Sequence, residues 1–140
     1  MEVPAMRPFP GAYLRFIQLF NAGKYWESHE VLESPWRENR SRFYRGIIIY
    51  ASAFVHAQRG NPRGVRKQLL KARRYLEAYR PHYLGIDVDR LLAHAARCLE
   101  VVSGDAPPEG PALARAIPFD RLTLDARLVR GDEPELADGP

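Results

Sequence analysis

The sequence predicts an all-α, single-domain bundle of about five helices with a short irregular C-terminal tail. Apolar residues recur at every third or fourth position in five successive segments, which is the spacing of one helix face. Glycine, proline and asparagine separate these segments at short intervals, and helices with short connections pack as a bundle. The chain has 140 residues, enough for one domain whose core needs no disulfide.

The first two predicted helices are residues 10–23 and 24–37. Apolar residues from Tyr13 to Phe20 have helical spacing in the first, which ends in an Asn-Ala-Gly stop signal. Pro35 lies near the end of the second, where the N–H that it lacks kinks or tightens the last turn. Two separate helices are therefore expected before residue 40.

Each of the next three predicted helices begins at a polar residue that can accept hydrogen bonds from the first turn. These helices are residues 41–59 with Ser41 as the N-cap, residues 62–80 with Asn61, and residues 87–104 with Asp87. Pro62 occupies the first position of its helix, where the missing N–H costs nothing. The helix at 41–59 is apolar on most faces, so we expect it at the centre of the bundle.

The composition changes near residue 104. Residues 1–104 contain 17 Lys and Arg against 9 Asp and Glu, whereas residues 105–140 contain 4 against 8. A proline-rich and glycine-rich linker opens the second part, and the acidic "DEPELADGP" that ends it is typical of disorder. We therefore predict a helical bundle at 1–104, and a linker with a partly disordered acidic tail at 105–140.

Several features predict a cytoplasmic protein with no membrane partner. The longest apolar run, Gly46 to Val55, is much shorter than a membrane-spanning helix. The N-terminus "MEVPAMRPFPG" lacks the basic start and long apolar stretch of a signal peptide. A single cysteine, Cys98, excludes an internal disulfide and a zinc site built from cysteines.

The second predicted helix places acidic and aromatic side chains on one face. At about 100° per residue, the positions that share an arc of about 120° are Trp26, His29, Glu30, Glu33 and Trp36. Glu33 lies between the two tryptophans and beside His29. If the indoles pack inward, this carboxylate is partly desolvated and needs a partner.

The third predicted helix offers polar partners for that face. Arg45, Ser52 and His56 form one narrow polar stripe on an otherwise apolar helix. A polar stripe on a central helix must meet other polar groups, because unsatisfied donors inside a protein are costly. We therefore expect residues 29–33 to face this stripe across a groove between two antiparallel helices.

The segment "FNAGKYWESHEVLESPWR", the turn "GNPRG" and the later "YLGIDV" resemble an uncharacterised prokaryotic family, the domain of unknown function 309. The resemblance covers about residues 13–92. It implies a small all-helical protein, and it implies no established activity.

One hypothesis for the polar face is a metal or acid–base site. His29 and Glu33 are spaced i, i+4 and can reach one ion, and His56 would join them from across the groove. Imidazole and carboxylate ligands suit zinc, iron or manganese. Glu30 or Glu33 would act as the catalytic general base. The residues expected to line the ligand pocket are Trp26, Trp36, Arg45 and Ser52.

Other interpretations remain open from the sequence. The same residues can form a structural network of ion pairs and hydrogen bonds, with no chemistry, inside a helical protein-interaction module. The helix at 62–80 is strongly basic and can bind an anion or RNA, although no known nucleic-acid motif accompanies it. Exposed aromatic residues of the first helix or the tail would support a homodimer. Whether the protein is an enzyme is also left open.

Overall fold

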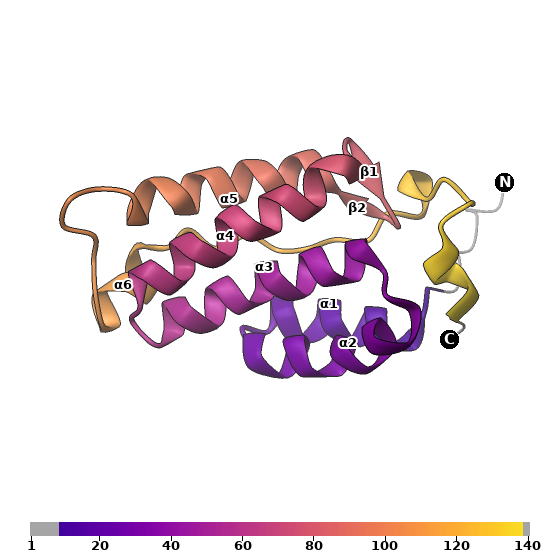
Figure 1. Ribbon diagram of the computed structural model, residues 1–140, viewed down its shortest axis with the longest axis horizontal. Helices are drawn as coiled ribbons and strands as arrows, with labels where there is room; N and C mark the ends of the chain where they lie inside the picture. Colours follow the sequence, from indigo (N-terminus) through magenta and orange to yellow (C-terminus); the bar gives the residue numbers. More distant parts are fainter. Residues whose placement is uncertain (1–8, 139–140) are drawn as a thin grey trace, which may run out of the picture.

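The computed structural model describes residues 9–138, which form an elongated helical bundle (Figure 1). The six α-helices of these residues are α1 (Gly11–Asn21), α2 (Tyr25–Asn39), α3 (Arg42–Gln58), α4 (Pro62–Leu76), α5 (Val88–Val102) and α6 (Pro111–Ala116). A two-stranded antiparallel hairpin pairs β1 (His82–Tyr83) with β2 (Ile86–Asp87). The short 3-10 helices are η1 (Glu77–Tyr79), η2 (Ala126–Leu128) and η3 (Pro134–Asp138). The predicted all-α fold is confirmed, and α6 and the hairpin are additions to it.

The three predicted helix N-caps are present. Each cap side chain accepts a hydrogen bond from the backbone N–H three residues later, and the pairs are Ser41 with Tyr44, Asn61 with Gly64, and Asp87 with Arg90. These bonds satisfy N–H groups that have no partner inside the helix. Local sequence chemistry therefore fixes where α3, α4 and α5 begin.

Helix α3 lies at the centre of the bundle, and most of its residues are buried. A Cβ atom built on Gly46 would lie 2.6 Å from Cδ2 of Leu76 on α4. The absence of a side chain at Gly46 therefore lets α3 and α4 approach each other closely. The apolar residues on most faces of α3 predicted this central position, because a helix surrounded by other helices exposes little surface.

Helices α2 and α3 are antiparallel, as two cation–π contacts demonstrate. The guanidinium of Arg45, early in α3, lies 4.8 Å from the ring centre of Trp36, late in α2. The guanidinium of Arg59, just after α3, lies 5.6 Å from the ring centre of Trp26, early in α2. The α2 face between the two tryptophans therefore runs along the polar stripe of α3.

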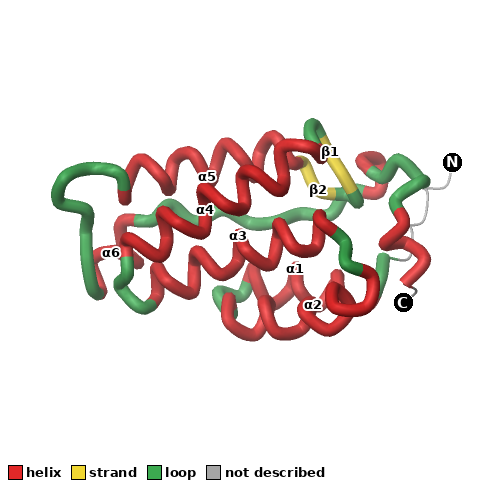
Figure 2. Tube along the Cα trace, in the orientation of Figure 1, coloured by secondary structure: helices red, strands yellow, loops and turns green. Residues whose placement is uncertain are grey.

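The segment after α6 returns along the bundle to the end where β1 and β2 lie (Figure 1), and most of it is loop (Figure 2). Its acidic end is folded against the bundle over the described residues 132–138, although its composition is typical of disorder. Glu133 and Glu135 are each only 3% exposed. Glu135 accepts hydrogen bonds of 2.6 Å from the hydroxyls of Ser41 and Tyr83. The division of the chain at residue 104 stays a prediction.

Glu133 binds the hairpin turn. Its carboxylate accepts hydrogen bonds from the backbone N–H groups of Leu84, Arg130 and Gly131, at 3.0, 3.0 and 2.6 Å. Burial raises the pKa of the Glu133 carboxyl, but the surrounding N–H groups outweigh it and hold the pKa below its ordinary value of 4.5. The folded protein therefore favours the ionised carboxylate.

A pH-dependent loss of stability follows from this contact. A carboxyl whose pKa is depressed by folding stabilises the protein above its unfolded pKa, and this stabilisation is lost as pH falls through the folded value. The free energy of unfolding of Glu133→Gln should therefore be lower than that of the unmodified protein at pH 7. The difference should shrink below pH 4.5. Urea unfolding at several pH values measures it.

The control for this experiment is Glu109→Gln, because Glu109 is an exposed glutamate that precedes α6. It should match the unmodified protein at every pH. The loss of unfolding free energy in Glu133→Gln could instead stay constant from pH 7 to about pH 3. That result would contradict a lowered pKa of Glu133, since folding would then not favour the ionised carboxylate.

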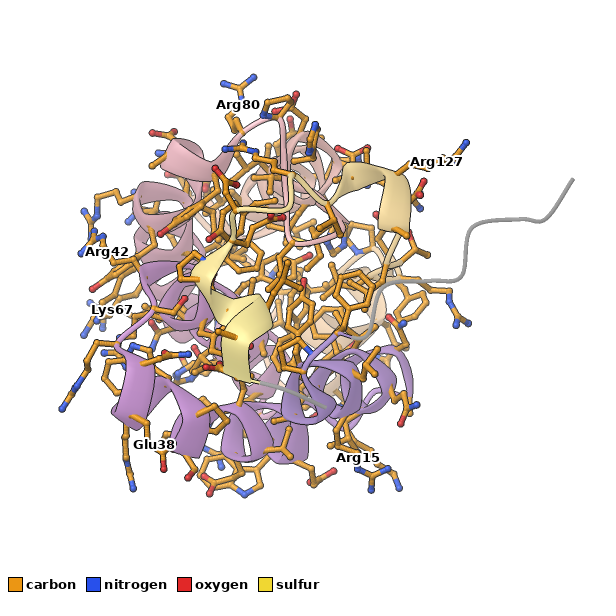
Figure 3. The ribbon with its side chains drawn as sticks, turned by 90° about the vertical axis from the view of Figure 1, so that its right-hand side faces the viewer. Arg15, Glu38, Arg42, Lys67, Arg80 and Arg127 are labelled. Atoms are coloured by element: carbon orange, nitrogen blue, oxygen red, sulfur yellow. The ribbon has the colours of Figure 1, made fainter. Side chains whose placement is uncertain are left out.

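Within residues 9–138, no helix is long and apolar enough to cross a membrane. The predicted absence of a signal peptide rests mostly on residues 1–8. These residues lie outside the described part of the chain. Charged side chains such as Arg15, Glu38, Arg80 and Arg127 point outward around the bundle (Figure 3).

Candidate metal site

Three polar side chains of α2 lie close together on the face between Trp26 and Trp36. Nδ1 of His29 lies 3.6 Å from Oε1 of Glu30 and 3.9 Å from Oε2 of Glu33. One ligand atom from each residue lies within 4.8 Å of the other two. His29 and Glu33 are one helical turn apart, so α2 itself sets this geometry.

The imidazole of His29 is held in place by Trp26. The two rings stack with their centres 5.6 Å apart and their planes at 17°. Nδ1 of His29 is buried, and it has no hydrogen-bond partner among the described residues. A buried nitrogen without a partner is unusual, because desolvation then costs free energy that no bond returns. A cation bound between this nitrogen and the two carboxylates would relieve this cost.

Glu33 has a second partner that the sequence analysis missed. Its Oε1 accepts a hydrogen bond of 2.7 Å from the guanidinium of Arg37, while Oε2 faces His29. The i, i+4 spacing of glutamate and arginine on one helix is the sequence signal that could have identified this pair. The side chain of Glu33 is 28% exposed, so its carboxylate is partly desolvated. The partner that such a carboxylate needs is Arg37 of the same helix.

Trp36 and Arg45 form a separate contact. The indole of Trp36 has the guanidinium of Arg40 4.9 Å from its ring centre and that of Arg45 4.8 Å from it. Arg45 therefore stacks on an aromatic ring, and the ion pair of Glu33 is made with Arg37. The sequence had predicted that residues 29–33 face Arg45. Trp26 stacks on His29 of the polar cluster, whereas Trp36 contacts the two arginines and packs against the hydrophobic core. A ligand pocket lined by these residues stays a prediction.

Ser52 and His56 also bond elsewhere. The hydroxyl of Ser52 donates to the backbone carbonyl of Ile49 within α3, at 2.6 Å. Nδ1 of His56 lies 3.2 Å from the side-chain nitrogen of Asn61, and its ring occupies the space that a side chain at Gly64 would fill. His56 therefore lies beside the first turn of α4 and does not join the three-residue cluster. Burial, followed by the charges of Arg59 and Lys67, lowers the pKa of His56.

The cluster of His29, Glu30 and Glu33 offers one nitrogen and two oxygen ligands. Zinc, iron and manganese accept such mixed sets, with bonds of about 2.0 to 2.2 Å for zinc. Atoms bound to one ion at that distance lie at most about 4.4 Å apart, and the separations of 3.6 and 3.9 Å between Nδ1 of His29 and the two carboxylates are within this limit. The side chain of Glu30 is 51% exposed, so it can adjust its position toward an ion.

The basic helix is α4, and its cationic side chains face solvent. Its exposed basic residues are Arg63, Arg66, Lys67, Arg73 and Arg74. Lys67 of α4 and Arg42 of α3 point outward on the same side of the molecule (Figure 3). None of the ion pairs found in residues 9–138 includes an α4 residue. Binding of an anion or RNA through this helix stays a prediction.

The region from α1 into α4 contains all the candidate site residues, and it also has recognisable relatives. Residues 13–68 match the family described as a domain of unknown function, DUF309. The predicted resemblance to this family is therefore confirmed over residues 13–68. The DUF309 match includes the whole of α2 and α3, and it assigns no activity to either helix.

A curated relative extends the comparison beyond that region. The chain is 35% identical over 91 residues to the uncharacterized protein YpuF of Bacillus subtilis. The aligned part covers 60% of this chain and 52% of YpuF. The chain thus spans about half the length of this curated relative, whose name likewise assigns no activity.

Proposed function

We propose that this protein binds a divalent metal ion through His29, Glu30 and Glu33 on α2. The observation that supports the proposal is the buried Nδ1 of His29, which lacks a hydrogen-bond partner in residues 9–138 and faces two carboxylates. A metal ion accepts the nitrogen lone pair and offsets the repulsion between the two acidic groups. It would therefore satisfy all three side chains together.

The ligand types favour zinc, iron(II) or manganese(II). Imidazole nitrogen suits zinc and iron, and carboxylate oxygen suits manganese. Three ligands from one helix leave other coordination positions for water or a bound molecule. Trp26 covers one face of the His29 ring and would keep that ring oriented toward the ion.

A role in catalysis is a separate prediction from metal binding. Glu30 and Glu33 are the predicted general bases, but both carboxylates serve as ligands in this proposal. A ligand carboxylate is a poor general base, because the metal withdraws its electron pair. Metal binding therefore accounts for these two residues without assigning an enzymatic activity.

Calorimetric titration with Zn²⁺ and with Mn²⁺ at pH 7.5 tests the proposal. The unmodified protein should bind one ion, and His29→Ala and Glu33→Gln should each lower the affinity by at least about 100-fold, since each removes a direct ligand. Circular dichroism of the same samples would verify that the variants keep their helices.

Two control variants distinguish the loss of a metal ligand from a general loss of structure or charge. His56→Ala should bind as tightly as the unmodified protein, because His56 lies beside α4. Glu27→Gln should also leave the affinity unchanged, because Glu27 is an exposed carboxylate of α2 outside the cluster. Dissociation constants weaker than about 1 mM for both ions, or equal affinity in His29→Ala, would refute the proposal.

A further inference from the structure

A cavity lies between the ends of three helices and the segment that follows α6. The cluster of His29, Glu30 and Glu33 does not line it. The volume of the cavity is about 330 Å³. Phe20, Tyr25 and Phe54 line one side of it, and their rings contact one another with centres 5.1 to 5.5 Å apart. Ile117 and Phe119, from the segment after α6, also line it. Aromatic rings therefore form much of the lining.

The outer wall of this cavity, residues 117–120, is held by specific bonds on both sides of Phe119. Nε2 of His94 lies 2.6 Å from the carbonyl oxygen of Pro118, which can only accept, so Nε2 carries the proton. Arg90 donates two hydrogen bonds to Asp120, at 3.1 and 2.8 Å. Such bonds make a pre-formed wall, which is the usual state of a small-molecule site.

The polar groups that line the cavity carry little free charge. The hydrogen-bonded Arg90 guanidinium neutralises Asp120 and lowers its pKa. Burial lowers the pKa of His94, so this imidazole is neutral at pH 7. Burial raises the pKa of Tyr25, so its hydroxyl keeps its proton. An ionised ligand would therefore lose its hydration and find no unpaired opposite charge among these groups.

Phe119 provides an apolar surface at the cavity. It is 61% exposed, although it is a large hydrophobic residue. Pro118 before it is bonded to His94 and Asp120 after it is bonded to Arg90. These two bonds hold the backbone of Phe119 at the cavity. An exposed aromatic ring beside an aromatic-lined hollow supplies a stacking surface for a planar group.

We propose that this cavity binds a small neutral aromatic molecule. Its volume is near the lower end of the range of about 300 to 1,000 Å³ for small-molecule sites, so a ligand with a single ring fits best. The aromatic lining favours a planar ring over a saturated one. The neutral Tyr25 hydroxyl supplies a hydrogen bond for one polar substituent.

Benzamide, benzoate and cyclohexanecarboxamide are the probes that separate these requirements. Benzamide is neutral and aromatic, benzoate carries a charge on a similar frame, and the third lacks the aromatic ring. Titrations followed by the amide resonances of Gly23 and Phe119 should saturate with benzamide. Benzoate and cyclohexanecarboxamide should each bind at least about 10-fold more weakly.

Two tryptophan substitutions on α6 give a matched pair. Ala114 is exposed and lines the cavity, whereas Ala112 is exposed and does not. Ala114→Trp should fill the mouth and weaken benzamide binding at least about 10-fold. Ala112→Trp should leave the affinity unchanged, and both variants should keep the unmodified melting temperature because neither position is buried.

Four results would overturn the proposal. The first is an absence of saturable shifts up to the solubility of benzamide. The second is equal binding of benzamide and benzoate. The third is equal binding of benzamide by the two tryptophan variants. The fourth is a concentration-dependent shift of the Phe119 resonance without any probe, because a second copy of the chain would then cover this surface.

Discussion

Replacing Asn21 by alanine should lower the free energy of unfolding by about 2 to 4 kcal/mol, because it leaves two backbone groups without partners. The Asn21 side chain donates a hydrogen bond of 2.7 Å to the carbonyl of Leu122 and accepts one of 2.8 Å from its N–H. The two residues are 101 positions apart. One side chain thereby fastens the C-terminal segment to the end of α1. Urea unfolding followed by circular dichroism measures the loss.

Asn21→Asp tests whether both bonds matter. The aspartate keeps an acceptor for the N–H of Leu122, but it has no donor for the carbonyl, so it should also be destabilised. Gln18→Ala is the control, because Gln18 is an exposed residue of the same helix. The amide of Leu122 should exchange with solvent faster in both Asn21 variants. A loss no larger than that of Gln18→Ala would show that the contact contributes nothing.

Replacing Gly60 by alanine should cost about 3 kcal/mol of stability, because steric overlap adds to the backbone strain. Gly60 has a φ of +72°, and a Cβ atom there would lie 2.4 Å from the Cα of Gly110. The neighbour is backbone, so no side-chain rotation can relieve the overlap. The hydrogen bond from the N–H of Gly110 to the carbonyl of Gly60 would also be broken or strained. Thermal and urea unfolding measure the effect.

Gly23→Ala separates the two causes. Gly23 has a similar φ of +76°, but a Cβ atom there would meet nothing within 4 Å. Its replacement should therefore cost only the backbone strain of about 1 to 2 kcal/mol. Equal losses in Gly23→Ala and Gly60→Ala would mean that the linker before α6 moves away freely from Gly60. The close packing of Gly60 and Gly110 would then be unimportant for stability.

Much of the helical framework could be predicted because its causes are local. The N-caps Ser41, Asn61 and Asp87 bond to groups three residues away, so the relevant atoms are close in sequence. The apolar character of α3 placed it at the centre for a similar reason. Helix α6 and the hairpin were not predicted, because α6 has only six residues and each strand only two.

The candidate site was only partly predictable. The sequence placed His29, Glu30 and Glu33 on one helix face, since helical spacing alone determines this. It did not determine which residues of α3 they would meet. Arg45 stacks on Trp36 and His56 lies beside Asn61, because each long side chain can choose among several neighbours once the helices pack.

The sequence by itself determined the helices, their caps and the acidic face of α2, since all of these depend on residues within one or two turns. Only the tertiary structure decided that the acidic tail folds against the bundle, that His56 stays apart from His29, and that a cavity forms beside Phe119. Those outcomes depend on contacts such as Asn21 with Leu122, whose partners lie in segments without a repeating pattern. Local periodicity contains no information about such pairs, because their free energy arises only when distant segments meet.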